Sequence, residues 1–151
     1  MVLTQKEVSL LKDMKTQEEL CIEKYGKYAC YACDSELKNL FTELMNTEKK
    51  HLNTLTNMLG KDAGGESKFS SFACDNPSES TSCPAGIDAQ KYDAFLCQDM
   101  LAMEKHVSGA YDTTIFEFSD PQNRQTLNEI QKEEQQHGEK LYSYMSKHGM
   151  Y

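Results

Sequence analysis

The sequence predicts an all-α fold: a four-helix bundle made of two repeated antiparallel helix pairs with a long crossover. Three observations support this prediction. Apolar residues recur at steps of three and four in four segments, a polar stretch separates the second segment from the third, and the second half of the chain repeats the first. The chain has 151 residues, which suits one domain with a substantial core. We expect a single domain over residues 1–151, with helix pairs at 4–60 and 88–148 and the crossover at 61–87.

The first helix pair is delimited by residues that favour helix ends. Thr4 and Glu7 fit a capping box, and the apolar stripe that follows extends to Ala32. This predicts a helix of roughly 28 residues, or about 42 Å at ~1.5 Å per residue. Asp34 is placed to cap a second helix and Gly60 to end it. Because the turn between the two helices is so short, they must be antiparallel neighbours.

The crossover and the second pair have equally clear signals. Residues 61–87 are rich in glycine, serine, proline and aspartate, a composition typical of a connection. Their roughly 27 residues could extend about 90 Å at ~3.3 Å each, enough to return along the whole bundle. A third helix is expected from Asp88. Asp120 followed by Pro121 is a strong start for the fourth.

The repeat places a glutamate at a core position of each predicted helix. Glu18 lies 30 residues before Glu48, and Glu104 lies 30 residues before Glu134 (48 − 18 = 134 − 104 = 30). A shift of 86 residues (104 − 18) superimposes the two sets. It also aligns other positions of the stripes: Met14 with Met100, Tyr25 with Tyr111, Leu44 with Ile130, and Leu55 with Leu141. We interpret the shift as an internal duplication of a helix pair.

A histidine follows the second glutamate of each half, in Glu48-Lys-Lys-His51 and Glu134-Gln-Gln-His137. Residues three apart on a helix project from the same face, so each Glu and His can reach one metal ion. Four ionised carboxylates cannot share a dry core without counter-charge, since each desolvation costs several kcal/mol. Two divalent cations would balance them with both histidines neutral. The four glutamates and two histidines are therefore predicted to hold two divalent ions, iron or manganese, because the ligand set suits both.

Two other interpretations of these six residues stay open. They could be ordinary solvated side chains on wet helix faces, although two matched sets in phase with the apolar stripes argue against this. Alternatively, the carboxylates are buried but protonated, or paired with lysine, in a bundle that has lost its metal. No lysine lies on the predicted inward stripes, which weakens the paired version.

Composition excludes two classes of partner. The net charge of −8 and the pI near 5.0 argue against nucleic acid, which calls for a basic face. No run approaches the roughly 20 apolar residues of a membrane span, and the N-terminus lacks an apolar signal core. We expect cytoplasmic synthesis without a signal peptide.

Five of the six cysteines invite an interpretation. Cys30 and Cys33 lie one turn apart near the end of the first helix and could be packed hydrophobes, a redox pair or cross-linking thiols. Cys74 and Cys83 lie in the polar connection, where we expect a disulfide that pins the connection, or bonds to neighbouring molecules, once the protein meets an oxidant. Cys21 lies on the inward stripe and could approach the metals.

The ligand pattern leads to a family resemblance. One glutamate from each of two helices plus Glu-x-x-His from each of two others resembles the ferritin-like di-iron carboxylate pattern. Tyr25 and Tyr111, each seven residues after a first glutamate, are similar to tyrosines of rubrerythrin-like members. Facing inward, they could hydrogen-bond the ligand carboxylates and orient the site.

The whole chain more specifically resembles the spore coat protein F family of endospore-forming bacteria. The resemblance is carried by segments such as Gln17-Glu-Glu-Leu-Cys-Ile-Glu-Lys-Tyr25 and Asn128-Glu-Ile-Gln-Lys-Glu-Glu-Gln-Gln-His137. It implies a ferritin-like bundle and a place in the spore coat, with other coat proteins and further copies of the chain as partners. It implies no activity.

Two functions are compatible with these observations. The first is a structural or assembly component of the spore coat, whose metal site mainly stabilises the bundle. The alternative is a di-metal oxidoreductase acting on peroxide or oxygen, catalase- or peroxidase-like. Rubrerythrins also carry a rubredoxin domain with two Cys-x-x-Cys pairs, whereas this chain has one, Cys30 and Cys33. Catalase chemistry would need no electron donor, but the missing donor and the coat resemblance favour the structural component.

Overall fold

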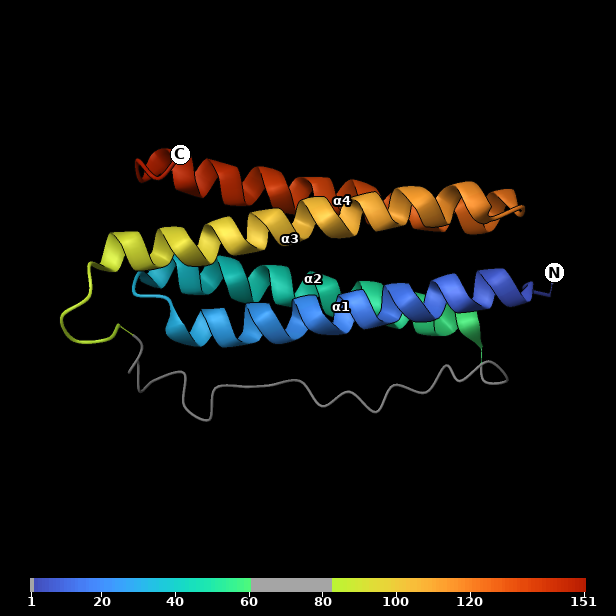
Figure 1. Cartoon of the computed structure of the whole chain (residues 1–151), viewed down its shortest axis with the longest axis horizontal. Helices are drawn as coiled ribbons and strands as arrows, with labels where there is room; N and C mark the ends of the chain where they lie inside the picture. The colour runs from blue at the N-terminus through green and yellow to red at the C-terminus, as the bar shows by residue number, and fades with distance from the viewer. Residues whose placement is uncertain (1, 61–82) are drawn as a thin grey trace.

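The computed structural model describes residues 2–60 and 83–151 and contains four helices (Figure 1). In chain order they are α1 (Gln5–Tyr31), α2 (Ser35–Leu59), α3 (Ala89–Glu117) and α4 (Pro121–Lys147). The described residues contain no strand, so the predicted all-α four-helix class is confirmed. Most of the expected crossover, residues 61–82, lies outside the described residues.

Each helix begins at the cap that the sequence indicates. At α1 the Thr4 backbone N–H donates to Glu7 (2.8 Å) and the Glu7 backbone N–H donates to the Thr4 hydroxyl (3.2 Å), which completes the capping box. The other three helices are capped by aspartates: Asp34, Asp88 and Asp120. The capping residue that ends α2 is Gly60, with φ of +71°, a conformation that favours glycine.

The helices form two antiparallel pairs, α1 with α2 and α3 with α4 (Figure 1). The pairs lie side by side, with α1 also packed on α3 and α2 on α4. In Figure 1, α2 ends at the opposite end of the bundle from the start of α3, so these two helices run in the same direction. Within the described ranges, no helix combines the length and the apolarity needed to cross a membrane.

The core is built from side chains at repeat-related positions of the two halves. Leucines, methionines, an isoleucine, a cysteine and a phenylalanine project inward at the spacing that the apolar stripes predict, and at most 4% of each is exposed. These matched pairs are Leu11 and Cys97, Met14 and Met100, Phe41 and Leu127, Leu44 and Ile130, and Leu55 and Leu141. Because burying one large apolar side chain contributes about 1.5–3 kcal/mol, this shared core holds the two pairs together.

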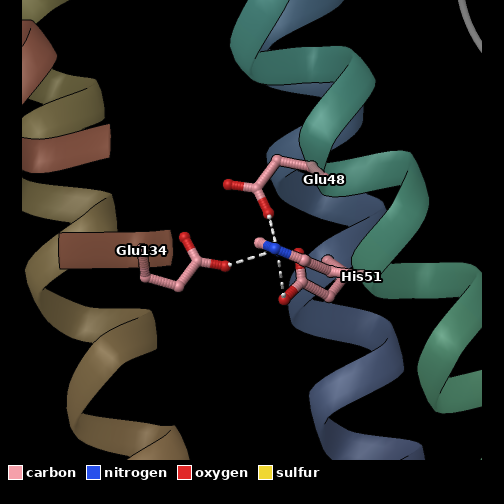
Figure 2. Close-up of side chains that lie close together, drawn as sticks. Glu48, His51 and Glu134 are labelled. Atoms are coloured by element: carbon pink, nitrogen blue, oxygen red, sulfur yellow. Dashed lines mark hydrogen bonds and ion pairs between the residues drawn. The ribbon is translucent and has the colours of Figure 1, made fainter. Parts of the chain in front are cut away.

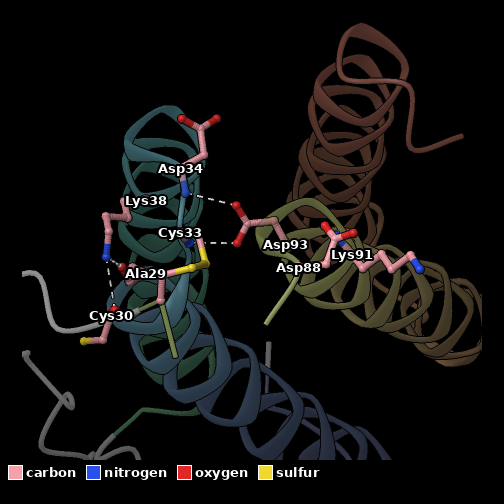
Figure 3. Close-up of a disulfide and its surroundings, with 9 residues drawn as sticks. Ala29, Cys30, Cys33, Asp34, Lys38, Asp88, Lys91 and Asp93 are labelled. Atoms are coloured by element: carbon pink, nitrogen blue, oxygen red, sulfur yellow. Dashed lines mark hydrogen bonds between the residues drawn. A yellow bond between two sulfur atoms is a disulfide. The ribbon is translucent and has the colours of Figure 1, made fainter. Parts of the chain in front are cut away.

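One acidic side chain of each helix pair accepts hydrogen bonds from the turn of the other pair. The Asp93 carboxylate accepts hydrogen bonds from the backbone N–H groups of Cys33 (2.8 Å) and Asp34 (2.9 Å), in the turn between α1 and α2 (Figure 3). Glu7 accepts one from the Ser119 backbone N–H (3.3 Å), in the turn between α3 and α4. The 86-residue shift relates Glu7 to Asp93 and Cys33 to Ser119. The contacts are therefore exchanged between the halves, which local sequence patterns did not reveal.

Asp93→Ala is expected to lower the free energy of unfolding by roughly 3–6 kcal/mol, because a hydrogen bond to a charged group contributes about 1.5–3 kcal/mol and two are lost. Asp93 is 3% exposed. Urea unfolding at pH 7 measures the change. Asp112→Ala is the matched control on the exposed face of the same helix and should change stability by less than about 0.5 kcal/mol. Equal losses in the two variants would show that Asp93 does not hold the turn.

Candidate metal centre

All six residues predicted as metal ligands lie together near the middle of the bundle. Each is a polar side chain in the core, with at most 3% of its surface exposed. They come from all four helices: Glu18 from α1, Glu48 and His51 from α2, Glu104 from α3, and Glu134 and His137 from α4. This convergence follows from the apolar stripes, because each glutamate occupies a stripe position near the midpoint of its helix.

The first group of potential ligands surrounds His51. Its Nδ1 atom lies 3.0 Å from Glu48 Oε2 and 3.1 Å from Glu134 Oε1 (Figure 2). Glu18 Oε1 is 3.8 Å away. Each of these four residues offers one ligand atom, and the four atoms lie within 4.8 Å of one another. One ion could contact all four.

The second group surrounds His137 in the same way. Its Nδ1 atom lies 3.0 Å from Glu48 Oε1, 3.3 Å from Glu104 Oε1 and 3.5 Å from Glu134 Oε2. These four residues also offer ligand atoms within 4.8 Å of one another. Glu48 and Glu134 belong to both groups, each with its two oxygens directed to different histidines. Two ions would therefore share two carboxylates.

Two buried tyrosines hold the outer carboxylates of the cluster. The Tyr25 hydroxyl donates to Glu104 Oε1, and the Tyr111 hydroxyl donates to Glu18 Oε1. Both tyrosines are 0% exposed. Each reaches from one helix pair to a glutamate of the other pair. The hydrogen bond restricts the rotation of the carboxylate and leaves its second oxygen available.

Three buried carboxylate oxygens have no hydrogen-bond partner among the described residues: Glu18 Oε2, Glu104 Oε2 and Glu134 Oε2. Buried polar atoms nearly always have a partner, because leaving one unsatisfied costs about 1–3 kcal/mol or more. Cations are the natural partner for clustered carboxylate oxygens. Carboxylate and imidazole ligands together suit iron, manganese and zinc. The residues present therefore fit a pair of divalent ions.

Protons balance this cluster when no cation is bound. Burial, reinforced by the neighbouring carboxylates, raises the pKa of Glu18 and Glu104 well above the ordinary value. Burial also opposes ionisation of Glu48 and the two histidines. At Glu48 it is outweighed by hydrogen bonds with Glu18 and the histidines, and at the histidines by hydrogen bonds with the surrounding glutamates. The pKa of Glu48 is lowered, and the pKa rises to about 10 at His51 and about 12 at His137. Metal binding would replace these protons.

One carboxylate beside the cluster was missed by the sequence analysis. Glu133 Oε2 lies 2.6 Å from His51 Nε2, on the side of the ring that faces away from the other glutamates. Its side chain is half exposed. Such a carboxylate orients the imidazole and increases its basicity as a ligand. The repeat-related residue is Thr47 (133 − 86), so His137 has no matching carboxylate at that position.

A disulfide joins Cys33, in the turn between α1 and α2, to Cys83, which precedes α3 (Figure 3). The two Cα atoms are 4.7 Å apart. Cys30 is also disulfide-bonded, and Cys74 lies outside the described residues. Cys21 is a buried free thiol whose pKa is raised by burial and by the nearby carboxylates, and it belongs to neither ligand group in the described part of the chain.

The fold and the cluster together define an all-α bundle with a buried carboxylate–histidine site suited to two ions. The model of the Coat F domain family matches residues 92–151, which are 60 of the 151 residues. The match covers α3 from Tyr92 and all of α4, and so includes Glu104, Glu134 and His137. No curated protein and no solved structure matches the chain.

Proposed function

We propose that this chain is a structural and assembly component of the bacterial spore coat, built on a ferritin-like bundle that holds two divalent ions, iron or manganese. The observation that carries the metal proposal is the pair of ligand groups that share Glu48 and Glu134. The match of α3 and α4 to the Coat F domain supports the place in the coat.

The ferritin-like assignment is supported by the directions of the helices and by the pattern of potential metal ligands. Helices α2 and α3 run in the same direction (Figure 1), as they do in bundles with a long crossover between two antiparallel pairs. Each helix contributes a glutamate, and the second helix of each pair adds a histidine three residues later. This is the arrangement of di-metal carboxylate bundles.

In a structural component the ions would act as cross-links. The first ligand group draws on α1, α2 and α4, and the second on α2, α3 and α4. A cation that binds only the folded chain stabilises it by mass action. Two ions would therefore connect all four helices at their midpoints, where the apolar core is interrupted.

Partners in the coat would meet the bundle through its outer faces. Phe95 and Phe116 on α3 are 62% and 82% exposed. Large exposed apolar side chains of this kind are available for contacts with other coat proteins or with further copies of the chain.

The second candidate function is a di-metal oxidoreductase acting on peroxide or oxygen. It is favoured by a groove between α3 and α4 whose lining includes Glu104 and Glu134. A pair of redox-active ions would supply electron transfer to and from peroxide. Disproportionation is balanced without a donor, since two molecules of hydrogen peroxide give two of water and one of dioxygen.

Elemental analysis of the purified chain, followed by a peroxide assay, separates these functions. The protein is reconstituted separately with manganese and with iron, beside Glu134→Ala and the exposed control Glu129→Ala. We expect about two ions per chain in the wild type and in Glu129→Ala, fewer in Glu134→Ala, and no turnover above that of free metal. Peroxide turnover in the wild type and in Glu129→Ala that is lost in Glu134→Ala would favour the enzyme. Absence of tightly held ions would reject the metal centre.

Membership of the coat has a separate test. Spores of the producing organism can be fractionated, and the chain sought in the coat extract and in the core. We expect it in the coat extract. Recovery from the core alone would contradict the structural assignment, whatever the metal content.

A further inference from the structure

A groove between α3 and α4 leads from the surface toward the candidate metal centre. It has a volume of about 350 Å³. Glu104 and Glu134 line it, although they are only 2% and 1% exposed, so they form its buried end. Each of these two carboxylates has one oxygen without a hydrogen-bond partner among the described residues. The groove therefore approaches the two carboxylates, while their unsatisfied oxygens lie buried behind its floor.

Two small residues keep the groove open. Ser108 on α3 and Gly138 on α4 are part of its lining. The 86-residue repeat relates them to Ile22 and Leu52 (108 − 86 and 138 − 86). In the first helix pair these bulky side chains are 1% and 7% exposed. In the first pair, Ile22 and Leu52 thus fill the space that corresponds to the groove beside Ser108 and Gly138 in the second pair.

We propose that the α3–α4 groove is a one-sided entry path by which molecules of the size of hydrogen peroxide or azide reach the metal centre. This inference rests on the proposed metal centre and adds a direction of access to it. The first helix pair closes the opposite face, so the two ions would differ in accessibility. The ion held by Glu104 and His137 would be the accessible one, because Glu104 lines the groove and belongs only to that group.

The chain itself supplies the substitutions that test this path. Ser108→Ile and Gly138→Leu each copy the residue found at the related position of the first half. A Cβ atom at Gly138 would meet only Leu101 Cδ1, at 3.8 Å, an ordinary contact, so the new side chain enters the groove without displacing the backbone. Gly109→Leu is the matched control, because that exposed glycine of α3 has nothing within 4 Å of its Cβ position.

The metal content of every variant is determined first. The rate of azide binding to the iron-loaded protein is then measured by stopped-flow absorbance. We expect Gly109→Leu to bind azide at the wild-type rate. Ser108→Ile and Gly138→Leu should slow binding roughly tenfold, which corresponds to about 1.4 kcal/mol of additional barrier. Leu52→Gly should accelerate it by opening the other face.

The outcomes separate the path from the site. Wild-type rates in metal-loaded Ser108→Ile and Gly138→Leu would overturn the path and leave the metal centre standing. If Ser108→Ile and Gly138→Leu lose their ions, the path is tested by Leu52→Gly instead. An unchanged rate of azide binding in Leu52→Gly also overturns the one-sided path. A wild-type chain that holds no iron would overturn the metal centre and the path together.

Discussion

A Glu48→Ala variant is expected to hold fewer than two tightly bound ions per chain. Glu48 contributes one oxygen toward each histidine, so its removal takes a ligand from both groups at once. The remaining residues would leave one ion fully surrounded at best. Elemental analysis after dialysis measures the stoichiometry directly, and two tightly held ions in this variant would show that the ligand assignment is wrong.

The same substitution should remove most of the metal-dependent stability. At a free-ion concentration about 1,000 times Kd, one bound ion stabilises the folded state by roughly 4 kcal/mol. For a domain of about 150 residues this raises Tm by roughly 8–16 °C, since each kcal/mol corresponds to about 2–4 °C. Because the wild type is expected to bind two ions, thermal unfolding with and without manganese should show at least this rise in the wild type and a much smaller one in Glu48→Ala.

Glu43→Ala is the matched control for this prediction. Glu43 is an exposed residue of the same helix that forms an ion pair with Lys140. Exposed ion pairs contribute about 0–1 kcal/mol, so this variant should keep both the metal stoichiometry and the rise in Tm. A comparable loss in Glu43→Ala would point to a general effect of removing acidic charge.

Cys83→Ser is expected to destabilise the oxidised protein by about 4 kcal/mol, because in the chain-entropy model a cross-link that closes about 50 residues removes that much unfolded-state freedom. The disulfide with Cys33 spans a sequence separation of 50. Guanidinium unfolding under non-reducing conditions measures the loss. Reductant should lower the stability of the wild type toward that of the variant.

A double-mutant cycle identifies the pairing. If Cys33 and Cys83 are partners, the Cys33→Ser/Cys83→Ser double variant should be no less stable than either single variant, because each single change already breaks the bond. Losses that add would show that the two cysteines act independently. Peptide mapping of the oxidised protein provides a second, direct reading.

The contacts around the cluster are exchanged between the two halves of the chain. Tyr25 of the first pair donates to Glu104 of the second, and Tyr111 donates to Glu18 of the first. The turn contacts of Glu7 and Asp93 are exchanged in the same way. Neither helix pair can therefore complete the cluster by itself, which makes the centre a property of the assembled bundle.

The sequence by itself determined the helices. Caps such as Thr4 and Asp120, the stop at Gly60 and the three-and-four spacing of apolar residues act through contacts within a few residues, so they can be recognised locally. The repeat also indicated the six candidate ligands, because a glutamate in phase with an apolar stripe must face the core. Whether ions occupy those positions stays a prediction.

Only the tertiary structure decided which groups meet across the bundle. Glu133 beside His51, Asp93 on the opposite turn and Cys33 with Cys83 join residues between 50 and 82 positions apart. The sequence does not reveal these partners, since each partner lies on another element. The groove likewise depends on two small residues, Ser108 of α3 and Gly138 of α4, lining the same surface region. Local helix propensity determines where each helix forms, but the packing of neighbouring elements determines which groups each side chain contacts.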